Sequence, residues 1–540
     1  METESSGKMH LRDRYHGLAV TLAKLSLWLI SAAKDKALSF IDHHLKEGNS
    51  IIGTDRHQVK TSSQVGPLFE TSYQQIMGPV ISRYNTLNEI GSATKEDVEK
   101  QKEIYNEIQS MLQLIKKKYD YYLASQYAGG IKDEYQFASL LRSDDISDFD
   151  QPDMEGLWQI AKDKKFFHWE LEFPEVFLRW GFDIAIGNPP YVDVTAEEYK
   201  YLNLRTINTR NLYSFMMEIS IDNLKNSGYF GFIVPLSSMY TPRMSSLQNF
   251  MTEEKEVYIS SFAIRPAKIF KNVEQRICIF FGKKLIEGSS SSIYTTGYIR
   301  WYARERKKLF DCLQFSLNDC KERFNLEVVP KVGSAIEIDI LNKLYSKKKK
   351  IKDYVCKISN NSICYHGAVR YWLKAFNYIP EFYSERKGIS QSSEYKSIYF
   401  TEDIDPNIIV CLINSSLFYW YWLLMSDERH FLRKDIEDFP FDINDFDQIN
   451  TGRLDFLAEQ LMKSYRYHSS DKTVNLGGRT GIVRYYEFRP RYSKHIIDEI
   501  DHLLGEIYGI SDREIKFIVN YDTRFRMGDD EGELISETKN

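Results

Sequence analysis

The stretch from Gly181 to Val192 is the feature that most constrains the fold of this chain. It opens with a short run, Phe182–Ile186, that is apolar except at Asp183, and such runs are typical of buried strands in parallel sheets. The run stops at Gly187, and the residues Asn-Pro-Pro-Tyr follow at positions 188–191. In open α/β sheets, ligands bind outside the carboxyl ends of the strands. The sequence therefore predicts a ligand-binding loop at positions 188–191.

The chemistry of this loop suits a flat, hydrogen-bonding ligand. The two prolines fix the backbone and remove two N–H donors, which leaves nearby carbonyl groups free and rigidly oriented. The Asn188 amide offers an acceptor and donors, and the Tyr191 ring could stack on a nucleic-acid base. Together these groups could hold the edge and the face of a purine. The alternative is an ordinary strand-to-loop turn, because Asn-Pro is common in turns.

Strand and helix patterns alternate around this loop. Apolar residues at helical spacing predict a helix over residues 15–33. A second helix is expected at 211–225, ended by the turn Asn226-Ser-Gly228, and the next strands are expected at 229–235, 259–264 and 276–281. This alternation predicts an α/β fold with a doubly wound sheet and right-handed crossovers.

A helical insertion is expected between the first helix and the loop. Residues 94–122 are charged and have helical spacing, and Thr94-Lys-Glu-Asp97 predicts a capping box at their start. Their charges are expected to form a solvated face. Residues 129–165 are polar and acidic, and we expect them to be rich in loops.

Composition narrows the class of protein. The chain has 540 residues, of which 43% are hydrophobic and 27% charged, as in water-soluble globular proteins of two or three domains. No segment has the length and purity of a membrane span, and residues 1–10 do not form a signal peptide, so a cytoplasmic protein is expected. The six cysteines form no C-x-x-C pair, which argues against a zinc site or a disulfide framework. The net charge of −5 does not indicate nucleic-acid binding, so local basic patches would have to provide it.

Several motifs resemble one family in the same order along the chain. Residues 188–191 resemble the catalytic motif of the adenine-N6 branch of amino-group DNA methyltransferases. The upstream Phe-His-Trp-Glu-Leu-Glu-Phe-Pro-Glu-Val-Phe at 167–177 resembles the segment before that motif in Eco57I-like restriction-modification methylases. Residues 18–29 and 38–53 are similar to earlier blocks of the same family. The resemblance covers most of the chain.

The resemblance implies an adenine-specific DNA methyltransferase of a restriction-modification or phage-defence system. It would move a methyl group from S-adenosyl-L-methionine to adenine N6 in double-stranded DNA, after flipping the base out of the duplex. The Asn188 side chain and the Pro189 carbonyl would accept hydrogen bonds from the N6 amine, Pro190 would set the shape of the loop, and Tyr191 would stack on the base. Phe281 would be a second aromatic residue against the flipped base. No metal ion is implied.

The segments expected to bind the cofactor depart from the family pattern. In the block Lys46–Ser50, Asn49 is the residue that would face the cofactor adenine; an Asn-containing turn is the alternative. Where the family has an acidic residue for the cofactor ribose, this chain has Arg14, with Asp13 beside it. The glycine-rich turn that holds the methionine part of the cofactor is absent, and Gly477–Gly481 does not follow a convincing strand.

These departures leave several identities open. The methyltransferase sheet would be N-terminally incomplete, and the chain could be a fragment, one half of a split enzyme or a degenerate member. The second hypothesis is therefore a catalytically incomplete DNA-recognition subunit that needs a partner chain with the glycine-rich motif. A nuclease partner is a further possibility, and a methyltransferase for RNA or protein is a more remote one.

Domain boundaries are expected near residues 286 and 450. Residues 1–286 would form the catalytic domain, with the helical insertion at about 60–150, and residues 287–450 a mixed α+β target-recognition domain that begins after a Ser-rich break. In this domain the aromatic run at 412–422 is expected to be core. Residues 451–540 would be a helical C-terminal segment.

Basic clusters in the expected recognition domain are candidates for DNA contact. They are Arg300–Lys308, Lys347–Lys350 and the aromatic-rich Ile363–Trp372, in which Arg370 would bind the substrate. For each cluster a solvated helix face is the alternative.

Overall fold

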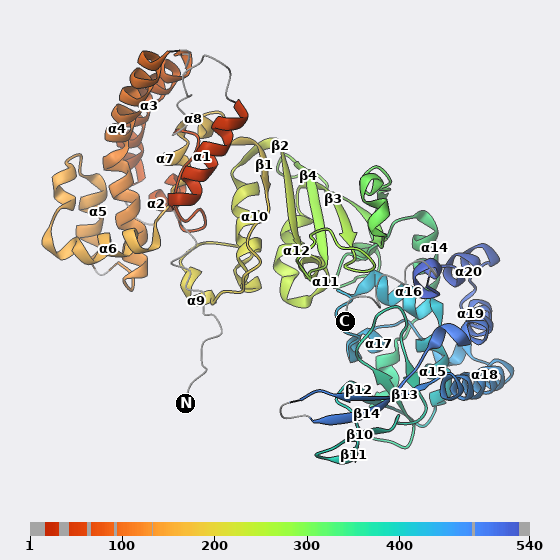
Figure 1. Cartoon of the computed structure of the whole chain (residues 1–540). Coiled ribbons are helices and arrows are strands. Elements are labelled where there is room, and N and C mark those ends of the chain that lie inside the picture. Colours follow the sequence, from red (N-terminus) through yellow and green to blue (C-terminus); the bar gives the residue numbers. More distant parts are fainter. Residues whose placement is uncertain are drawn as a thin grey trace. The chain divides into compact units, whose positions relative to one another are not determined.

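The structure is a computed structural model that describes residues 17–31, 43–61, 66–90, 94–131, 133–477 and 481–528. Its contacts divide the chain into two compact units (Figure 1). Unit 1 comprises residues 1–230 and 283–286, and unit 2 comprises residues 231–282 and 287–540. The segment expected to hold the ribose contact, with Asp13 and Arg14, lies outside the described residues, as does the first part of the block at 38–53.

Unit 1 is mainly helical. Its elements are α1 (Gly17–Ser31), α2 (Arg56–Thr61), α3 (Gly66–Glu89), α4 (Lys95–Tyr127), α5 (Glu134–Arg142), α6 (Glu155–Lys164), α7 (Trp169–Glu172), α8 (Pro174–Phe177), β1 (Phe182–Gly187), α9 (Ala196–Tyr199) and α10 (Leu212–Asp222). The two long helices α3 and α4 pack side by side (Figure 1). They bury aliphatic and aromatic residues such as Val80, Tyr84, Ile108 and Leu112 between them.

The capping box predicted at the start of α4 is confirmed. The Thr94 hydroxyl accepts a hydrogen bond from the Asp97 backbone N–H at 3.1 Å, and the Asp97 carboxylate accepts one from the Thr94 N–H at 2.9 Å. The prediction for residues 129–165 was wrong, because this region forms α5, α6 and two short 3-10 helices. Their apolar residues, including Phe137 and Leu141, pack into the same core as α4, so burial outweighs the polar composition.

The largest sheet is mixed and has the strand order β1-β2-β4-β3-β5-β6. Its further strands are β2 (Leu224–Pro235), β3 (Lys255–Phe262), β4 (Ile277–Lys284), β5 (Ser292–Ile299) and β6 (Ser316–Leu317). β3 and β5 are parallel, whereas β5 and β6 are antiparallel. The mixed α/β class is therefore confirmed, and each strand predicted from the sequence is present.

The region after the loop differs from the sequence prediction in one turn. The strand β2 begins at Leu224, so residues 226–228 belong to it and not to a turn after α10. The helix α10 ends at Asp222 instead. The sheet also extends past residue 286, where a domain boundary was expected, because β5 pairs with β3.

Unit 2 adds two four-stranded sheets and a group of helices. The sheets have the orders β7-β12-β8-β9 and β11-β10-β14-β13. Their strands are β7 (Val355–Cys356), β8 (Ser362–His366), β9 (Ala375–Phe376), β10 (Phe382–Ser384), β11 (Gly388–Ser390), β12 (Tyr395–Phe400), β13 (Ser470–Asn475) and β14 (Ile482–Glu487). The C-terminal segment expected to be helical thus also contains a hairpin, β13–β14, which pairs with β10.

The helices of unit 2 pack around a strongly apolar pair. They are α11 (Ser237–Tyr240), α12 (Ser245–Met251), α13 (Cys320–Arg323), α14 (Ala335–Leu344), α15 (Pro406–Asn414), α16 (Ser416–Met425), α17 (Arg433–Glu437), α18 (Gln448–Tyr467), α19 (Lys494–Tyr508), α20 (Asp512–Val519) and α21 (Thr523–Arg526). The expected core run is confirmed, because α15 and α16 are almost entirely buried. In the described parts of the chain, a membrane-spanning length of apolar helix is reached only by α15 and α16 counted together, across a bend of 68°.

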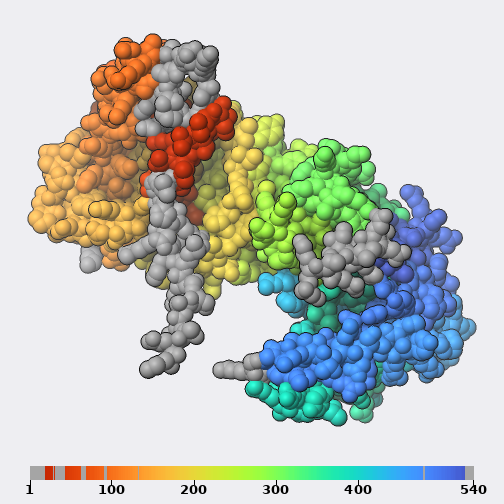
Figure 2. Space-filling view, viewed as in Figure 1, coloured from red at the N-terminus to blue at the C-terminus, as the bar shows by residue number. Residues whose placement is uncertain are grey.

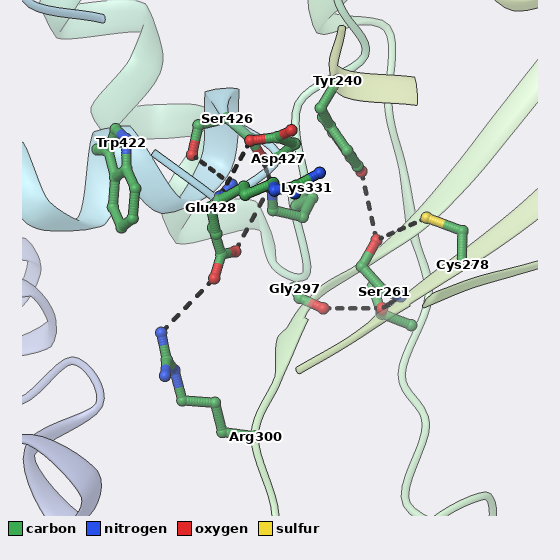
Figure 3. Close-up of polar contacts among 12 residues, drawn as sticks. Tyr240, Ser261, Cys278, Gly297, Arg300, Lys331, Trp422, Ser426, Asp427 and Glu428 are labelled. Atoms are coloured by element: carbon green, nitrogen blue, oxygen red, sulfur yellow. Dashed lines mark hydrogen bonds and ion pairs between the residues drawn. The ribbon is translucent and has the colours of Figure 1, made fainter. Parts of the chain in front are cut away.

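A buried group of charges lies inside unit 2 (Figure 3). Lys331 is fully buried, and its ammonium group donates to the Ser426 carbonyl at 2.5 Å and lies 3.8 Å from the Glu428 carboxylate. Arg300 approaches the same carboxylate at 3.6 Å and pairs with Asp522 at 2.8 Å. Burial raises the pKa of Glu428 to about 7 and lowers the pKa of Lys331 to about 8.

Candidate functional site

The predicted ligand-binding loop follows β1 directly. Asn188 and Pro190 are exposed, Pro189 is buried and Tyr191 is half-buried. The Tyr191 hydroxyl donates a hydrogen bond to the Asn188 side-chain oxygen at 3.0 Å. The Asn188 oxygen, which is expected to accept a hydrogen bond from a ligand, therefore already accepts one from Tyr191, the residue expected to stack on that ligand. A ligand that hydrogen-bonds Asn188 has to replace this contact.

The loop is fixed to the start of α10. The Leu212 N–H donates to the Val192 carbonyl at 3.0 Å, and the Asn211 side chain donates to Asp193 at 2.9 Å. Asn211 also caps α10, since its side-chain oxygen accepts from the Tyr213 N–H. The Tyr213 ring meets the Tyr191 ring edge to face, with centroids 6.2 Å apart. These contacts position Tyr191 on one side of the loop.

Asn49 lies in a buried turn of the same unit. Only 6% of its surface is exposed, and its side-chain oxygen accepts a hydrogen bond from the Ile51 N–H at 3.3 Å. Its backbone N–H donates to the Lys165 carbonyl at 2.8 Å. The side-chain oxygen therefore supports the turn itself, which is the alternative role for this residue.

The turn at residues 49–54 is held by the segment at 165–169. The Phe167 N–H donates to the Ile52 carbonyl at 2.8 Å, and the Trp169 indole N–H donates to the Ser50 carbonyl at 2.9 Å. Gly53 permits this close approach, because a Cβ at that position would lie 2.0 Å from the Phe167 carbonyl oxygen.

A buried histidine also holds the turn at 49–54 against the segment at 165–169. His168 is fully buried; its Nδ1 accepts from the Thr54 N–H at 3.0 Å, and its Nε2 lies 3.0 Å from the Asp120 carboxylate of α4. Because Nδ1 is an acceptor, Nε2 carries the hydrogen and donates it to Asp120. His168 thus joins the Asn49 turn, α4 and the segment before β1.

An aromatic cluster continues from this segment to β1. The Trp169 and Phe173 rings stack with centroids 5.9 Å apart, and Phe182, the first residue of β1, meets them edge to face at 5.7 and 5.5 Å. Aromatic pairs of this geometry contribute about 0.5–1.5 kcal/mol each beyond their burial. The Asn49 turn and the strand that ends at Asn188 are therefore parts of one packed region.

The sequence motifs identify the segment at 167–177, but they do not show that it holds the turn at 49–54. His168, Asp120 and Gly53 were not predicted as site residues. The available signal was the unusual density of aromatic and acidic residues in Phe-His-Trp-Glu-Leu-Glu-Phe. Their partners lie more than 100 residues away in the sequence at Thr54, a pairing that local patterns do not encode.

The other predicted substrate residues belong to unit 2, whereas the loop belongs to unit 1. Phe281 of β4 is 41% exposed and stacks on Tyr258 with centroids 5.0 Å apart. Tyr258 stacks in turn on Tyr294 at 4.7 Å, so Phe281 ends a row of three rings. Arg370 is exposed and follows β8. The roles of these two residues in substrate binding stay predictions.

Other candidate sites are few in the described parts of the chain. Within those ranges no group of three or more His, Cys, Asp or Glu side chains could hold a metal ion. The cysteines are free thiols, of which four are buried. A basic hollow of about 260 Å³ in unit 1 is lined by four lysines and by Trp158, but Lys116 pairs with Glu172 at 3.0 Å and Lys165 with Glu47 at 2.7 Å.

The geometry defines an α/β domain with a polar and aromatic loop at the end of a strand. Residues 15–270 match the family model of the Eco57I restriction-modification methylase. This part of the chain is therefore homologous to the Eco57I restriction-modification methylases, as the sequence motifs indicate.

Named relatives agree with this assignment. The type II restriction enzyme and methyltransferase RM.Eco57I of Escherichia coli is 25% identical over 262 residues, which are 42% of this chain and 25% of that protein. The putative type II restriction enzyme and methyltransferase RM.MjaORFECS2P of Methanocaldococcus jannaschii is 35% identical over 83 residues, 15% of this chain and 7% of that protein. The chain thus spans a quarter or less of these relatives.

Similar solved structures come from restriction-modification enzymes. The type IIL enzyme MmeI in complex with DNA is 11% identical, with 71% of this chain and 64% of that chain covered and a TM-score of 0.31. The type IIG restriction endonuclease BpuSI is 9% identical, with 63% and 54% covered and a TM-score of 0.25. These overlaps are partial.

Proposed function

We propose that this chain is the methyltransferase part of a restriction-modification or phage-defence system, and that it methylates adenine N6 in double-stranded DNA. The observation that carries the proposal is the position of Asn188-Pro-Pro-Tyr191 at the carboxyl end of β1, with Asn188 exposed and Tyr191 beside it. The family match over residues 15–270 supports the proposal.

The loop can hold an adenine by its edge and its face. The Asn188 side-chain oxygen and the Pro189 carbonyl would each accept a hydrogen bond from the N6 amine, which keeps electron density on that nitrogen. The Tyr191 ring would stack on the base and offset part of the cost of unstacking it from the duplex. An N6–H group of the base would replace the Tyr191 hydroxyl as the donor to the Asn188 side-chain oxygen.

S-adenosyl-L-methionine would supply the methyl group when bound. Displacement at a methyl carbon needs the nucleophile held in line, so positioning of N6 by this loop would provide much of the acceleration. The described residues would form one side of a cofactor site. The Asn49 amide is largely buried and used within its own turn, and the strand that leads to Asn188 has an open face.

This open face favours a second candidate, a subunit that is active only with a partner chain. Ile184 and Ile186 of β1 are 63% and 85% exposed, and β1 is the terminal strand among the described strands of its sheet. Five large apolar residues of α1 are also exposed by 45% or more, and Figure 2 shows this helix (red) on the surface of unit 1. Such apolar strands are normally covered. A partner with a strand, a glycine-rich turn and a helix would cover β1 and supply the missing side of the cofactor site.

Methyl transfer from labelled S-adenosyl-L-methionine to unmethylated duplex DNA tests both candidates. The chain is assayed alone beside Asn188→Ala, and the product is digested to nucleosides. Label on adenine N6 with the parent chain only would support the enzyme. Absence of label, from a folded protein that still binds DNA, would favour the partner-dependent subunit. Equal labelling by Asn188→Ala would refute the assignment of the loop.

A further inference from the structure

An exposed arginine lies in the loop that follows β3, close to the buried Arg300. This residue is Arg265. The backbone N–H groups on either side of it, at Ala263 and Ala267, donate to the carbonyls on either side of Arg300 at 3.0 and 3.1 Å. These two hydrogen bonds fix the loop along the residues that follow β5, while the Arg265 side chain stays open to solvent.

A second loop, between β8 and β9, reaches Arg300 through Tyr371. The Arg300 guanidinium group lies 5.2 Å from the centre of the Tyr371 ring. The Gly367 N–H donates to a backbone carbonyl at 2.8 Å, and the Trp372 indole N–H donates to another at 3.0 Å. Arg370 is exposed between these two anchors. Its position is therefore set by the loop, and its side chain is accessible.

Both exposed arginines act on the Tyr371 hydroxyl. Burial raises the pKa of this hydroxyl, and the charges of Arg300, Arg265 and Arg370 oppose that rise. Interactions between charges weaken with distance, so Arg265 and Arg370 lie on the same side of unit 2 as Tyr371. Within the described ranges, the Tyr371 hydroxyl has no hydrogen-bond partner.

Lys374 extends this positive region along the second loop. Its carbonyl accepts a hydrogen bond from the His366 N–H at 2.9 Å, so Lys374 lies opposite the last residue of β8. Burial lowers the pKa of its ammonium group to about 8; the Glu487 charge opposes this shift and the Arg370 charge adds to it. We call Arg265, Arg370 and Lys374 the basic group.

No acidic side chain pairs with the basic group in the part of the chain that the structure describes. The acids whose charges act on this region pair with other cations: Glu274 with Lys268, Glu487 with Lys472, and Asp522 with Arg300. One member of the basic group is also partly removed from water. Cations in such a setting are stabilised when an anion joins them.

We propose that the basic group, together with the Tyr371 hydroxyl, binds the sugar–phosphate backbone of double-stranded DNA. The proposal rests on the DNA substrate proposed above, but it concerns binding and not methyl transfer. Guanidinium groups match phosphate oxygens through their planar fork of donors, and hydroxyl groups also donate to phosphate. Of the basic group, only Arg370 was predicted from the sequence as a substrate residue.

The position of the basic group favours this ligand. Arg265 and Arg300 follow β3 and β5, which are parallel, and α/β sheets bind ligands outside the carboxyl ends of such strands. An acidic protein segment is the alternative ligand. Two anchored loops hold the cations at fixed positions, however, which suits the regularly spaced charges of a stiff duplex better than a flexible acidic segment.

Duplex binding as a function of salt tests the proposal on the full chain. Arg265→Ala and Arg370→Ala should each weaken the affinity for a fluorescent DNA duplex by about 3- to 10-fold, and each should reduce the slope of log K against log salt by about 0.9. The effect should be the same for duplexes of unrelated sequence, since backbone contacts carry no sequence information. The urea midpoint of unfolding should stay unchanged, because both side chains are exposed.

Lys374→Met separates DNA binding from a structural role. It should weaken duplex binding to a similar extent, yet leave the urea midpoint unchanged or raise it, because it removes a partly buried charge that has no paired acid. A fall in the urea midpoint with unchanged duplex affinity would show that Lys374 is structural and would remove it from the proposed site.

Arg453→Ala is the matched control, since Arg453 is an exposed arginine of unit 2 that already pairs with Glu506 at 3.3 Å. It should leave the affinity and the salt slope unchanged. Unchanged affinity and slope for both Arg265→Ala and Arg370→Ala would overturn the proposal, as would tighter binding to polyglutamate than to the duplex. A parent chain that binds duplex but transfers no methyl group would leave this proposal standing and count against the proposed function.

Discussion

Replacing Gly53 by alanine should uncouple the Asn49 turn from the strand that ends at the Asn188–Tyr191 loop. A Cβ at position 53 would lie 2.0 Å from the Phe167 carbonyl oxygen and 2.9 Å from its carbonyl carbon. Both are backbone atoms, so the clash cannot be relieved by a side-chain rotation. The segment at 165–169 or the turn at 49–54 has to move by about 1 Å or more to reach ordinary contact distances.

The cost follows from what that movement disrupts. Overpacking by one methyl group in a packed region costs about 1–3 kcal/mol. The shift also lengthens the hydrogen bonds from Phe167 to Ile52 and from Thr54 to His168, which contribute about 1 kcal/mol each. We therefore expect the free energy of unfolding of this region to fall by about 2–4 kcal/mol.

Hydrogen exchange measured by mass spectrometry reports on this region separately from unit 2. In Gly53→Ala, the amides of Thr54 and Phe167 should lose protection, while amides of the buried helix α16 should keep theirs. Gly156→Ala is the control, since a Cβ at Gly156 in α6 meets nothing within 4 Å; it should leave protection unchanged or raise stability by about 0.5 kcal/mol. Full protection of Phe167 in Gly53→Ala would refute this reasoning.

Three further predictions concern the loop and unit 2. Tyr191→Ala should change the urea midpoint of unfolding little, since Tyr191 is half-buried in a loop, yet reduce methyl transfer to duplex DNA roughly tenfold or more through lost stacking; an unfolded variant would contradict its position. Asp501 accepts from the Ser416 and Leu417 N–H groups at 2.7 and 3.2 Å, so Asp501→Ala should lower the unfolding free energy by about 1–3 kcal/mol, and an unchanged urea midpoint would count against this cap. The pKa of Glu428 is raised from 4.5 to about 7, which means that the folded state binds this proton more tightly than the unfolded state. The stabilisation from this proton is therefore full below pH 4.5 and is lost as the pH rises through 7. Glu428→Gln should make the urea midpoint of unfolding less dependent on pH in that window, and an unchanged pH dependence would argue against this prediction.

The elements that could be predicted are those with strong local signals. The capping box at Thr94 needs only four adjacent residues, and β1 is a short apolar run that ends at a glycine. In each case the residues that determine the structure are next to one another in the chain.

The elements that could not be predicted depend on distant partners. Residues 129–165 look like a loop by composition, but become helical where Phe137 and Leu141 pack on α4. The hairpin β13–β14 is stabilised by pairing with β10, about 100 residues earlier. His168 has no motif of its own, and its role follows only from meeting Thr54 and Asp120. Tertiary contacts of this kind override local preference.

The same contacts explain why the Asn49 turn and the Asn188–Tyr191 loop can be separated by a long helical insertion. α3 and α4 carry the chain out and back, and the end of α4 places Asp120 beside His168. Hydrogen bonds then attach the turn at 49–54 to residues 165–169. The Trp169 and Phe173 rings in turn pack against the Phe182 ring at the start of β1. Because each step is a direct packing or hydrogen-bond contact, a change in the insertion that shifts Asp120 should alter the position of the Asn49 turn before it affects Asn188. The insertion is therefore a structural part of the proposed site and not an appendage to it.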